Sequence, residues 1–336
     1  ITTFASNIGT SAVRLKTLNV TSVSEKSSEG NFNGDVYVDA ITLTGHDANG
    51  EVDAFFAKNA GFTTLTLDKV GGDEATATFD GTTAQTITGS ILGAVAGDGA
   101  ISVTNTAGTV TFASALGATK LGSVTLAAST TTVFDSTLSS ATLSASGAMT
   151  LKGAVTLTGT FTTADSSTIT LGSAFKNGGA VAITAADSDG TIDDTAGTVA
   201  VNLSNQFTSG TVTLLENTDP VDADTIASFA VTDTALVDYT LAAHASDVSL
   251  IDITASKRTT DGIATYLGMS SSQTAALGQV TTALASGDAT ASTAIDSALV
   301  SGGATAVNAV EQLNPDAGAG SAAAAAGASA VAGVVG

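Results

Sequence analysis

The sequence contains no cysteine, no tryptophan and only two prolines in 336 residues. The absence of cysteine excludes disulfide bonds, thiol catalysis and thiolate metal sites. Aromatic residues make up only 4% of the chain, so neither a thick core nor an aromatic anchor is expected. The 43% of hydrophobic residues are mainly Ala, with Val, Ile and Leu, which predicts a thin apolar layer that is repeated many times.

Positive charge is also scarce. Ten Lys and Arg stand against 31 Asp and Glu, which gives a net charge of −21 at pH 7. Proteins that bind nucleic acid need Lys and Arg to neutralise phosphates, so no nucleic-acid partner is expected. An anionic membrane surface would repel the chain as well, whereas the same charge keeps an extracellular surface soluble and attracts divalent cations.

Short runs that alternate Thr or Ser with Val, Ile or Leu dominate residues 1–258, and Gly, Asn and Asp separate them. Alternation with a period of two indicates β-strands that bury one face, and β-branched Thr suits the solvated face. The clearest runs are Leu15–Val20, Val36–Val38, Ile41–Leu43, Leu65–Leu67, Val124–Leu126, Val155–Leu157 and Val212–Leu214.

Internal repetition distinguishes a solenoid from a sandwich or a closed barrel. Thr3–Gly9 reappears as Thr111–Gly117, and Ala40–Gly45 reappears as Ala154–Gly159. Repeated strand blocks that cannot bury their apolar face alone are typical of stacked coils. The sequence therefore predicts an all-β fold, a right-handed parallel β-helix with about 20 residues in each coil.

The pattern changes after Arg258. Apolar residues take helical spacing, no Lys or Arg follows, and Ser270–Ser272 are candidate N-caps for the first helix. The predicted domains are a β-helical solenoid over 1–258, a small helical cap or junction over 259–316, and an Ala/Gly linker over 317–336. The apolar positions of the predicted helices are Leu277, Val280, Leu284, Ile295, Leu299, Val307, Val310 and Leu313.

Several segments share motifs with one group of bacterial surface proteins. They are Ile8–Gly9, Leu15–Val20, Asn31–Val38, Gly81–Gly89, Gly97–Ile101, Val110–Phe112, Asp238–Leu241, Ile251–Arg258 and Val310–Pro315. With them the chain resembles the β-helical passenger of large bacterial autotransporters, of the rickettsial outer-membrane surface-antigen or adhesin type. The resemblance implies a protein of the outer cell surface that belongs to the same precursor as an outer-membrane β-barrel. The strand pattern of that barrel is not found in these residues, which predicts a passenger cut before it.

Residues that could carry catalysis are few. The chain has two histidines, His46 and His244, and it lacks the HExxH, GxSxG and P-loop motifs. His46 is expected to be a turn residue, and no catalytic role is predicted for either histidine. A β-helix that cleaves glycans would need aromatic sugar platforms, but the chain has no Trp and three Tyr. The sequence therefore predicts a protein that is not an enzyme.

The best candidate for a metal site is the acidic segment Asp187–Asp194. Its carboxylates at Asp187, Asp189, Asp193 and Asp194, together with the turn at Gly190, offer the oxygen ligands that Ca²⁺ prefers. The segment lacks the twelve-residue EF-hand spacing and its bidentate Glu. A solvated loop between coils is the favoured interpretation, and a calcium site is the alternative. No cofactor is required by this sequence.

These observations predict a structural surface protein without enzymatic activity. Copies of the chain are the expected partners, in a stalk, a surface layer or a filament, and a host or neighbouring cell surface is a further partner if the protein is adhesive. One alternative is a calcium-dependent S-layer lattice protein. A glycan-cleaving β-helix is the third hypothesis.

Overall fold

The computed structural model describes residues 1–23, 26–46, 50–164, 167–175, 180–186, 199–203, 209–221, 223–271, 273–275 and 277–278. The chain divides into two compact units. Unit 1 comprises Ile1–Ser204, Thr211–Val231 and Leu241–Ile253, and unit 2 comprises Asn205–Gly210, Thr232–Thr240 and Thr254–Gly336.

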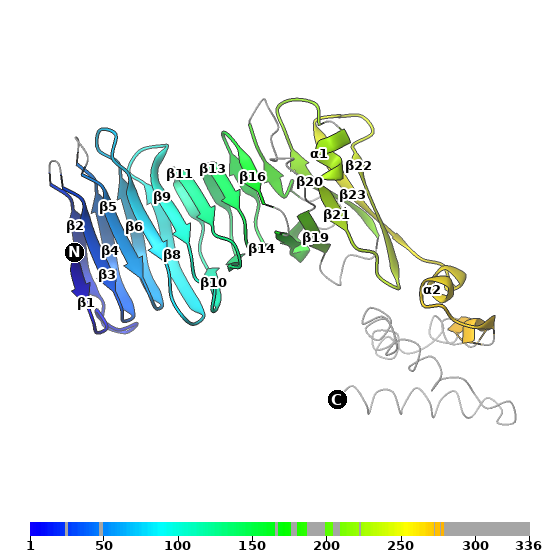
Figure 1. Cartoon of the computed structure of the whole chain (residues 1–336), viewed down its shortest axis with the longest axis horizontal. Coiled ribbons are helices and arrows are strands. Elements are labelled where there is room, and N and C mark those ends of the chain that lie inside the picture. The colour runs from blue at the N-terminus through cyan, green and yellow to red at the C-terminus, as the bar shows by residue number, and fades with distance from the viewer. Residues whose placement is uncertain are drawn as a thin grey trace, which may run out of the picture. The chain divides into compact units, whose positions relative to one another are not determined.

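Strands make up most of the described residues (Figure 1). In chain order the elements are β1 (Thr2–Phe4), β2 (Leu15–Thr21), β3 (Ser28–Phe32), β4 (Val36–Thr44), β5 (Val52–Phe56), β6 (Ala60–Asp68), β7 (Ala75–Phe79), β8 (Gln85–Gly93), β9 (Asp98–Val103), β10 (Thr109–Phe112), β11 (Leu116–Leu126), β12 (Thr131–Phe134), β13 (Leu138–Ala145), β14 (Ala148–Leu151), β15 (Val155–Leu157), β16 (Phe161–Thr163), β17 (Thr168–Leu171), η1 (Ser173–Phe175), β18 (Ile183–Thr184), β19 (Val199–Leu203), β20 (Gly210–Glu216), α1 (Ala223–Ala227), β21 (Phe229–Val231), β22 (Val237–Ala243), β23 (Leu250–Lys257) and α2 (Thr260–Tyr266).

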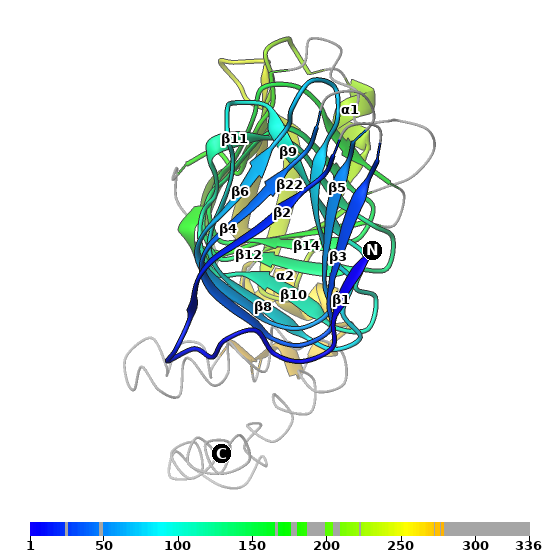
Figure 2. The same ribbon diagram turned by 90° about the vertical axis from the view of Figure 1, so that its left-hand side faces the viewer.

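Unit 1 is a parallel β-helix, as the sequence predicted. From β1 to β17, strands pair in parallel with strands one coil further along the chain, so β1 pairs with β3 and β2 pairs with β4. Three columns of strands result, and Figure 2 shows the coils stacked behind one another with the first coil in front. Column A contains β1, β3, β5, β7, β9, the ends of β11 and β13, and β16. Column B includes the start of β8, followed by β10, β12, β14 and β17. Column C includes Ile41 of β4, Leu65 of β6 and Ile91 of β8, followed by the starts of β11 and β13 and by β15.

The predicted strand runs all lie in strands, and alternation explains which face they bury. In β4, Val36, Val38, Ile41 and Leu43 are buried inside the coil, whereas the intervening Thr42 is partly exposed. Burying one residue in two gives each strand an apolar inner face, and each coil covers the edge of the next.

Stacked phenylalanines fill the core of the first coils. Phe4, Phe32, Phe56 and Phe79 occupy successive coils of column A, and their neighbouring ring centroids are 5.1, 5.2 and 5.4 Å apart. The prediction that the core needs no aromatic anchor is therefore wrong for these coils. Although phenylalanine is rare in this chain, one ring in each coil is enough because every ring stacks on the next.

The internal repeat was placed correctly for one segment pair and wrongly for the other. Ile41 and Val155 share column C through an unbroken series of paired residues. Phe4 lies in column A, whereas Phe112 pairs with Ile87 and Phe134 in column B. The segments Thr3–Gly9 and Thr111–Gly117 therefore have similar sequences but occupy different positions in their coils.

Coil length is not uniform, in contrast to the single value that the sequence predicted. Phe32 pairs with Phe56 among the long early coils, whereas Thr132 pairs with Met149, so the later coil is several residues shorter. Loops between strands absorb such differences, because only the paired residues must stay in register.

In unit 2, helix α2 follows strand β23, which ends at Lys257. Thr259 caps the helix, because its side chain accepts a hydrogen bond from the backbone N–H of Gly262 at 3.1 Å. The sequence interpretation missed this helix. It did identify Ser270, whose hydroxyl accepts the backbone N–H of Gln273 while the Gln273 side chain accepts the N–H of Ser270, which is a capping box. The remaining predicted helices and the linker over 317–336 lie outside the described residues, so the three-domain division stays a prediction.

Candidate interaction surface

The predicted calcium ligands Asp187, Asp189, Asp193 and Asp194 all lie outside the described residues. The structure therefore does not test the calcium hypothesis at this segment. Among the residues that are described, no group of three His, Asp or Glu side chains is arranged to hold a metal ion.

His46 lies two residues after the end of β4, where the sequence predicted a turn. Its backbone N–H donates to the carbonyl of Gly50 at 2.9 Å, so the two residues form an antiparallel bridge. Residues 47–49 of this loop lie outside the described part of the chain.

His244 belongs to a small polar cluster of unit 1. Its Nε2 lies 3.8 Å from Oδ2 of the largely buried Asp252, whose other oxygen accepts a 2.8 Å hydrogen bond from the Thr213 hydroxyl. The Ser246 hydroxyl lies 3.3 Å from Nδ1 of the histidine. These residue types are those of a serine hydrolase, but the imidazole lies beyond hydrogen-bond length from Asp252, so the carboxylate does not orient it as such a mechanism needs. The cluster instead links β20 and β23 to the loop that follows β22.

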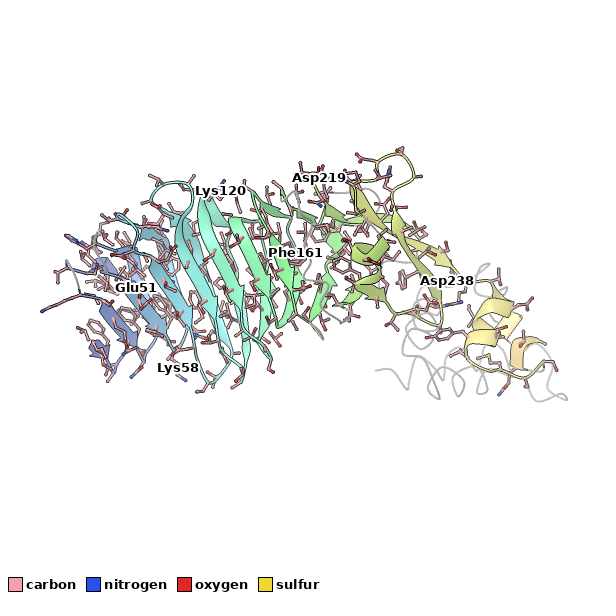
Figure 3. The ribbon with its side chains drawn as sticks, turned by 45° about the horizontal axis from the view of Figure 1, so that its top comes forward. Glu51, Lys58, Lys120, Phe161, Asp219 and Asp238 are labelled. Atoms are coloured by element: carbon pink, nitrogen blue, oxygen red, sulfur yellow. The ribbon has the colours of Figure 1, made fainter. Side chains whose placement is uncertain are left out.

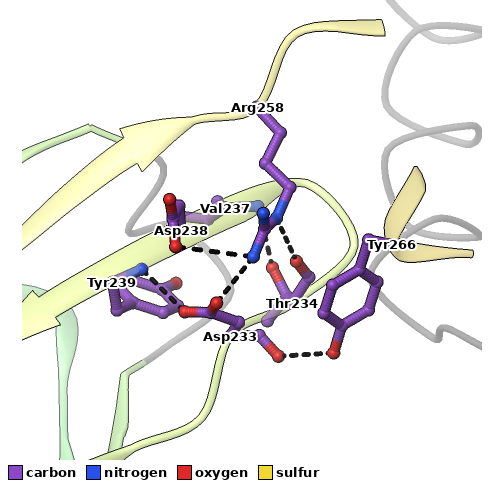
Figure 4. A network of polar contacts seen from close by, with 7 residues as sticks. All are labelled: Asp233, Thr234, Val237, Asp238, Tyr239, Arg258 and Tyr266. Carbon is purple, nitrogen blue, oxygen red and sulfur yellow. Dashed lines mark hydrogen bonds and ion pairs between the residues drawn. The ribbon is translucent and has the colours of Figure 1, made fainter. Parts of the chain in front are cut away.

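A second cluster centres on Arg258 of unit 2 (Figure 4). The guanidinium donates to the Asp233 carboxylate at 2.6 Å and to the Thr234 carbonyl at 3.2 Å, and it lies 4.9 Å from the centroid of the Tyr266 ring. The Tyr266 hydroxyl in turn donates to the Asp233 carbonyl at 2.9 Å. The cluster fastens helix α2 to the turn that precedes β22. A charge-assisted pair that is mostly buried suits this structural role.

Tyr239 lies beside the same cluster, and its backbone N–H donates to the Asp233 carboxylate at 2.8 Å. Burial raises the pKa of the Tyr239 phenol, and the negative charge of Asp233 raises it further. The phenol therefore remains neutral at physiological pH. This corner of unit 2 is held by neutral and paired groups, and nothing in its geometry points to proton transfer.

The first coil of unit 1 differs from the later coils in its exposed aliphatic side chains. Strands β1 and β2 pair with β3 and β4 on one side. Several large aliphatic side chains of this coil are exposed: Ile1 (89%), Val13 (73%), Val23 (59%) and Leu15 (44%). We call residues 1–23 and 26–28 the first coil.

Charge is distributed unevenly between this coil and the later coils. Residues 1–28 carry Arg14, Lys16 and Lys26 and a single acid, Glu25. Residues 177–256 contain twelve Asp and Glu and no Lys or Arg. Within unit 1, the later acids include Asp219, which lies on the outside of the unit, and the exposed Asp224 and Asp247 (Figure 3). The sequence interpretation noted the net charge but missed this asymmetry, which is visible from residue positions alone.

Helices long and apolar enough to span a membrane are not found within the described ranges. Comparisons with protein-family models, with curated proteins and with solved structures gave no match.

Proposed function

We propose that this chain is a structural protein of the bacterial outer surface without enzymatic activity, an autotransporter-type passenger that associates with copies of itself into a stalk, layer or filament. The observation that supports the proposal most directly is the parallel β-helix of unit 1, in which successive coils pair in register over three columns. That architecture serves extension and display, since its strength increases with the number of stacked coils.

The energetics of the coils agree with a mechanical role. Backbone hydrogen bonds join each coil to the next, and the column of phenylalanine rings adds an apolar stack that crosses the coil boundaries. Outside, Thr, Ser and Asp side chains and a net charge of −21 keep the surface hydrated. Stiffness and solubility are thus provided by different faces of the same strands.

Self-association and surface location are separate parts of the proposal and need separate tests. Light scattering and negative-stain electron microscopy of the chain at increasing concentration should reveal assemblies of growing mass. Protease treatment of intact source cells should release fragments of the chain. A protein that stays monomeric at high concentration, or that is protected in intact cells, would contradict the proposal.

Treatment of the assemblies with EDTA distinguishes the calcium-dependent lattice from the passenger. Dissolution by EDTA and recovery with Ca²⁺ would favour an S-layer protein, for which the net charge of −21 is the supporting observation. Assemblies that are insensitive to EDTA would favour the autotransporter-type passenger.

A further inference from the structure

We propose that the peptide bond between Arg258 and Thr259 is a gated cleavage site for a protease that selects basic residues. The gate is the cluster of unit 2 that holds the Arg258 side chain. The bond is protected while the cluster is intact, and it is cut when the cluster opens. The gate is independent of the self-association proposed above, since its residues all belong to unit 2.

The bond is distinguished by its position in the sequence. Residues 177–336 contain two basic residues, Lys257 and Arg258, and these two are adjacent. They lie where strand β23 ends and helix α2 begins, and Lys257 and Thr259, on either side of Arg258, are exposed. Surface connections between elements are the usual places of proteolytic cleavage. A protease that selects basic residues therefore meets a single place to cut over this length of chain.

The folded chain withholds this place from the protease. Such enzymes bind their substrate as an extended strand and insert the basic side chain into a pocket with an acid at its base. In unit 2 the Asp233 carboxylate already binds the Arg258 guanidinium at 2.6 Å, and only 17% of the arginine side chain is exposed (Figure 4). The Arg258 backbone N–H donates to the Leu236 carbonyl at 2.8 Å. Asp233 thus occupies the group that the protease needs.

The residues after the bond are folded as well. The Thr259 carbonyl accepts a 2.9 Å hydrogen bond from the backbone N–H of Ile263, and its hydroxyl accepts the N–H of Gly262 at 3.1 Å. The backbone therefore enters helix α2 directly after Thr259, in a conformation that does not fit an extended substrate cleft. Cleavage requires α2 to open first.

Few contacts hold α2 closed. The helix has seven residues, and helices this short are not stable without tertiary contacts. Ile263 and Ala264 are buried, and the Tyr266 hydroxyl donates to the Asp233 carbonyl at 2.9 Å. Asp233 therefore holds the segment at both ends, since its carboxylate binds Arg258 and its carbonyl binds Tyr266. Weakening this one residue should release the whole segment.

The net reaction is hydrolysis. Water adds to the carbonyl carbon of Arg258, the bond from that carbon to the Thr259 nitrogen breaks, and the nitrogen takes up a proton. The products are a chain that ends in the Arg258 carboxylate and a chain that begins with the Thr259 amine. Strands β1 to β23 remain on the first product, and α2 lies on the second.

Limited digestion with trypsin, followed by intact mass spectrometry, tests the gate. When opening and closing are faster than cleavage, the cleavage rate follows the population of the open form. Asp233→Asn removes the charge that holds Arg258, and it should speed the appearance of fragments 1–258 and 259–336 about tenfold or more. Tyr266→Phe keeps the ring but loses the hydroxyl, and it should speed cleavage by a smaller factor, about threefold.

The matched control is Asp135→Asn, which removes the carboxylate of an ion pair with Lys152 (2.7 Å) in unit 1 and should leave the rate of cleavage after Arg258 unchanged. K257Q/R258Q removes both basic side chains and should abolish cleavage by trypsin at this place. Thermolysin, which selects apolar residues, should cut inside α2 of K257Q/R258Q faster than inside α2 of the wild type. Circular dichroism verifies that each variant is folded.

Two results would overturn the proposal. If Asp233→Asn is cut after Arg258 no faster than Asp135→Asn, the cluster is not a gate. If the bond stays intact in both Asp233→Asn and Tyr266→Phe, it is not a cleavage site. Neither result bears on self-association, which light scattering measures separately.

Discussion

Buried polar side chains close the bends of the coil where backbone groups would otherwise lack partners. The Gln85 amide nitrogen donates to the Phe56 carbonyl at 2.6 Å, while its oxygen accepts the Gly81 N–H at 3.1 Å. Asn105, buried beside it, donates to Gln85 Oε1 at 2.9 Å. One side chain thus satisfies groups from two successive coils, which alternation of apolar residues cannot reveal.

We predict that Gln85→Ala lowers the free energy of unfolding by about 1–3 kcal/mol, because it removes the acceptor of the buried Gly81 N–H. Urea unfolding monitored by circular dichroism measures the change. Asn19→Ala removes an exposed amide from β2 and should alter stability by less than about 0.5 kcal/mol. Equal effects of the two substitutions would contradict the role assigned to Gln85.

Backbone conformation is equally restrictive at Gly117. Its φ is +74°, and a Cβ atom at this position would lie against the carbonyl oxygen of Ser139 in the next coil. Gly117→Ala should destabilise the protein by more than about 1–2 kcal/mol, since the left-handed conformation alone costs that much. Gly72→Ala is the control: an added Cβ meets nothing within 4 Å, so its melting temperature should be unchanged or slightly higher.

Asp53 makes stability depend on pH. Burial raises the pKa of this carboxyl, the hydrogen bond with Thr76 opposes the shift, and Glu51 and Glu29 add to it. Because the folded-state pKa is higher than the ordinary 3.8, the folded protein holds the proton more tightly, and stability falls as pH rises through the raised pKa. Asp53→Asn should therefore stabilise the protein at pH 7, and the gain should vanish at about pH 3.

The control for this pH dependence is Asp247, which is fully exposed. Hydrogen bonds from the hydroxyl and the backbone of Ser249 lower the pKa of Asp247, and His244 contributes in the same direction. Asp247→Asn should thus remove a favourable effect at pH 7. Urea midpoints at the two pH values measure both variants, and a stabilising Asp247→Asn would refute the reasoning.

At the scale of strands, the column of phenylalanines determines how neighbouring coils fit. Phe56 is 1% exposed and stacks between Phe32 and Phe79 at 5.2 and 5.4 Å. Its neighbour Phe55 points to the opposite face of β5 and is only partly buried. The same residue type therefore has two different energetic roles at adjacent positions of one strand.

Phe56→Ala should cost about 3–5 kcal/mol, because it opens a cavity in the stack that the coils above and below cannot fill. Phe55→Ala is the adjacent control and should cost less than half as much. Chemical unfolding of both variants gives the comparison. A similar loss from both would mean that stacking across coils contributes little.

The positions of many strands, and the residues of each that face the interior, were predictable, because alternation of Val, Ile or Leu with Thr specifies both. Runs such as Val36–Val38 and Val155–Leu157 lie in strands with those residues buried. Column membership was not predictable from a repeat alone, since Phe4 and Phe112 share a local sequence but end strands of different columns. The Phe column had a usable signal, because Phe4, Phe32, Phe56 and Phe79 recur at similar intervals along the sequence.

Contacts between surface charges were less accessible to sequence reasoning. The Lys16 ammonium lies 3.5 Å from the Asp39 carboxylate of the next coil, and that proximity depends on pairing between strands that are distant in the sequence. The proposed calcium ligands, in contrast, stand out in the sequence but lie outside the described residues. Clustering of one residue type along the chain indicates where charge is, and the fold decides whether a partner can reach it.

At the scale of the whole molecule, charge is the property that distinguishes this chain. A net charge of −21 favours solubility and opposes association between copies of the chain at low ionic strength. The self-association proposed above should therefore depend on ionic strength, because exposed charges are screened beyond about 10 Å at 0.1 M salt.

Pairing in unit 1 links each coil to its immediate neighbours, and long and short coils already coexist within one stack. A gene encoding such a unit can gain or lose whole turns by duplication or deletion, and the turns on either side need only meet in register again. The length of such a unit along its stacking direction is therefore a quantity that evolution, or an engineer, can adjust in steps of one strand spacing, about 4.8 Å, without redesigning the interior.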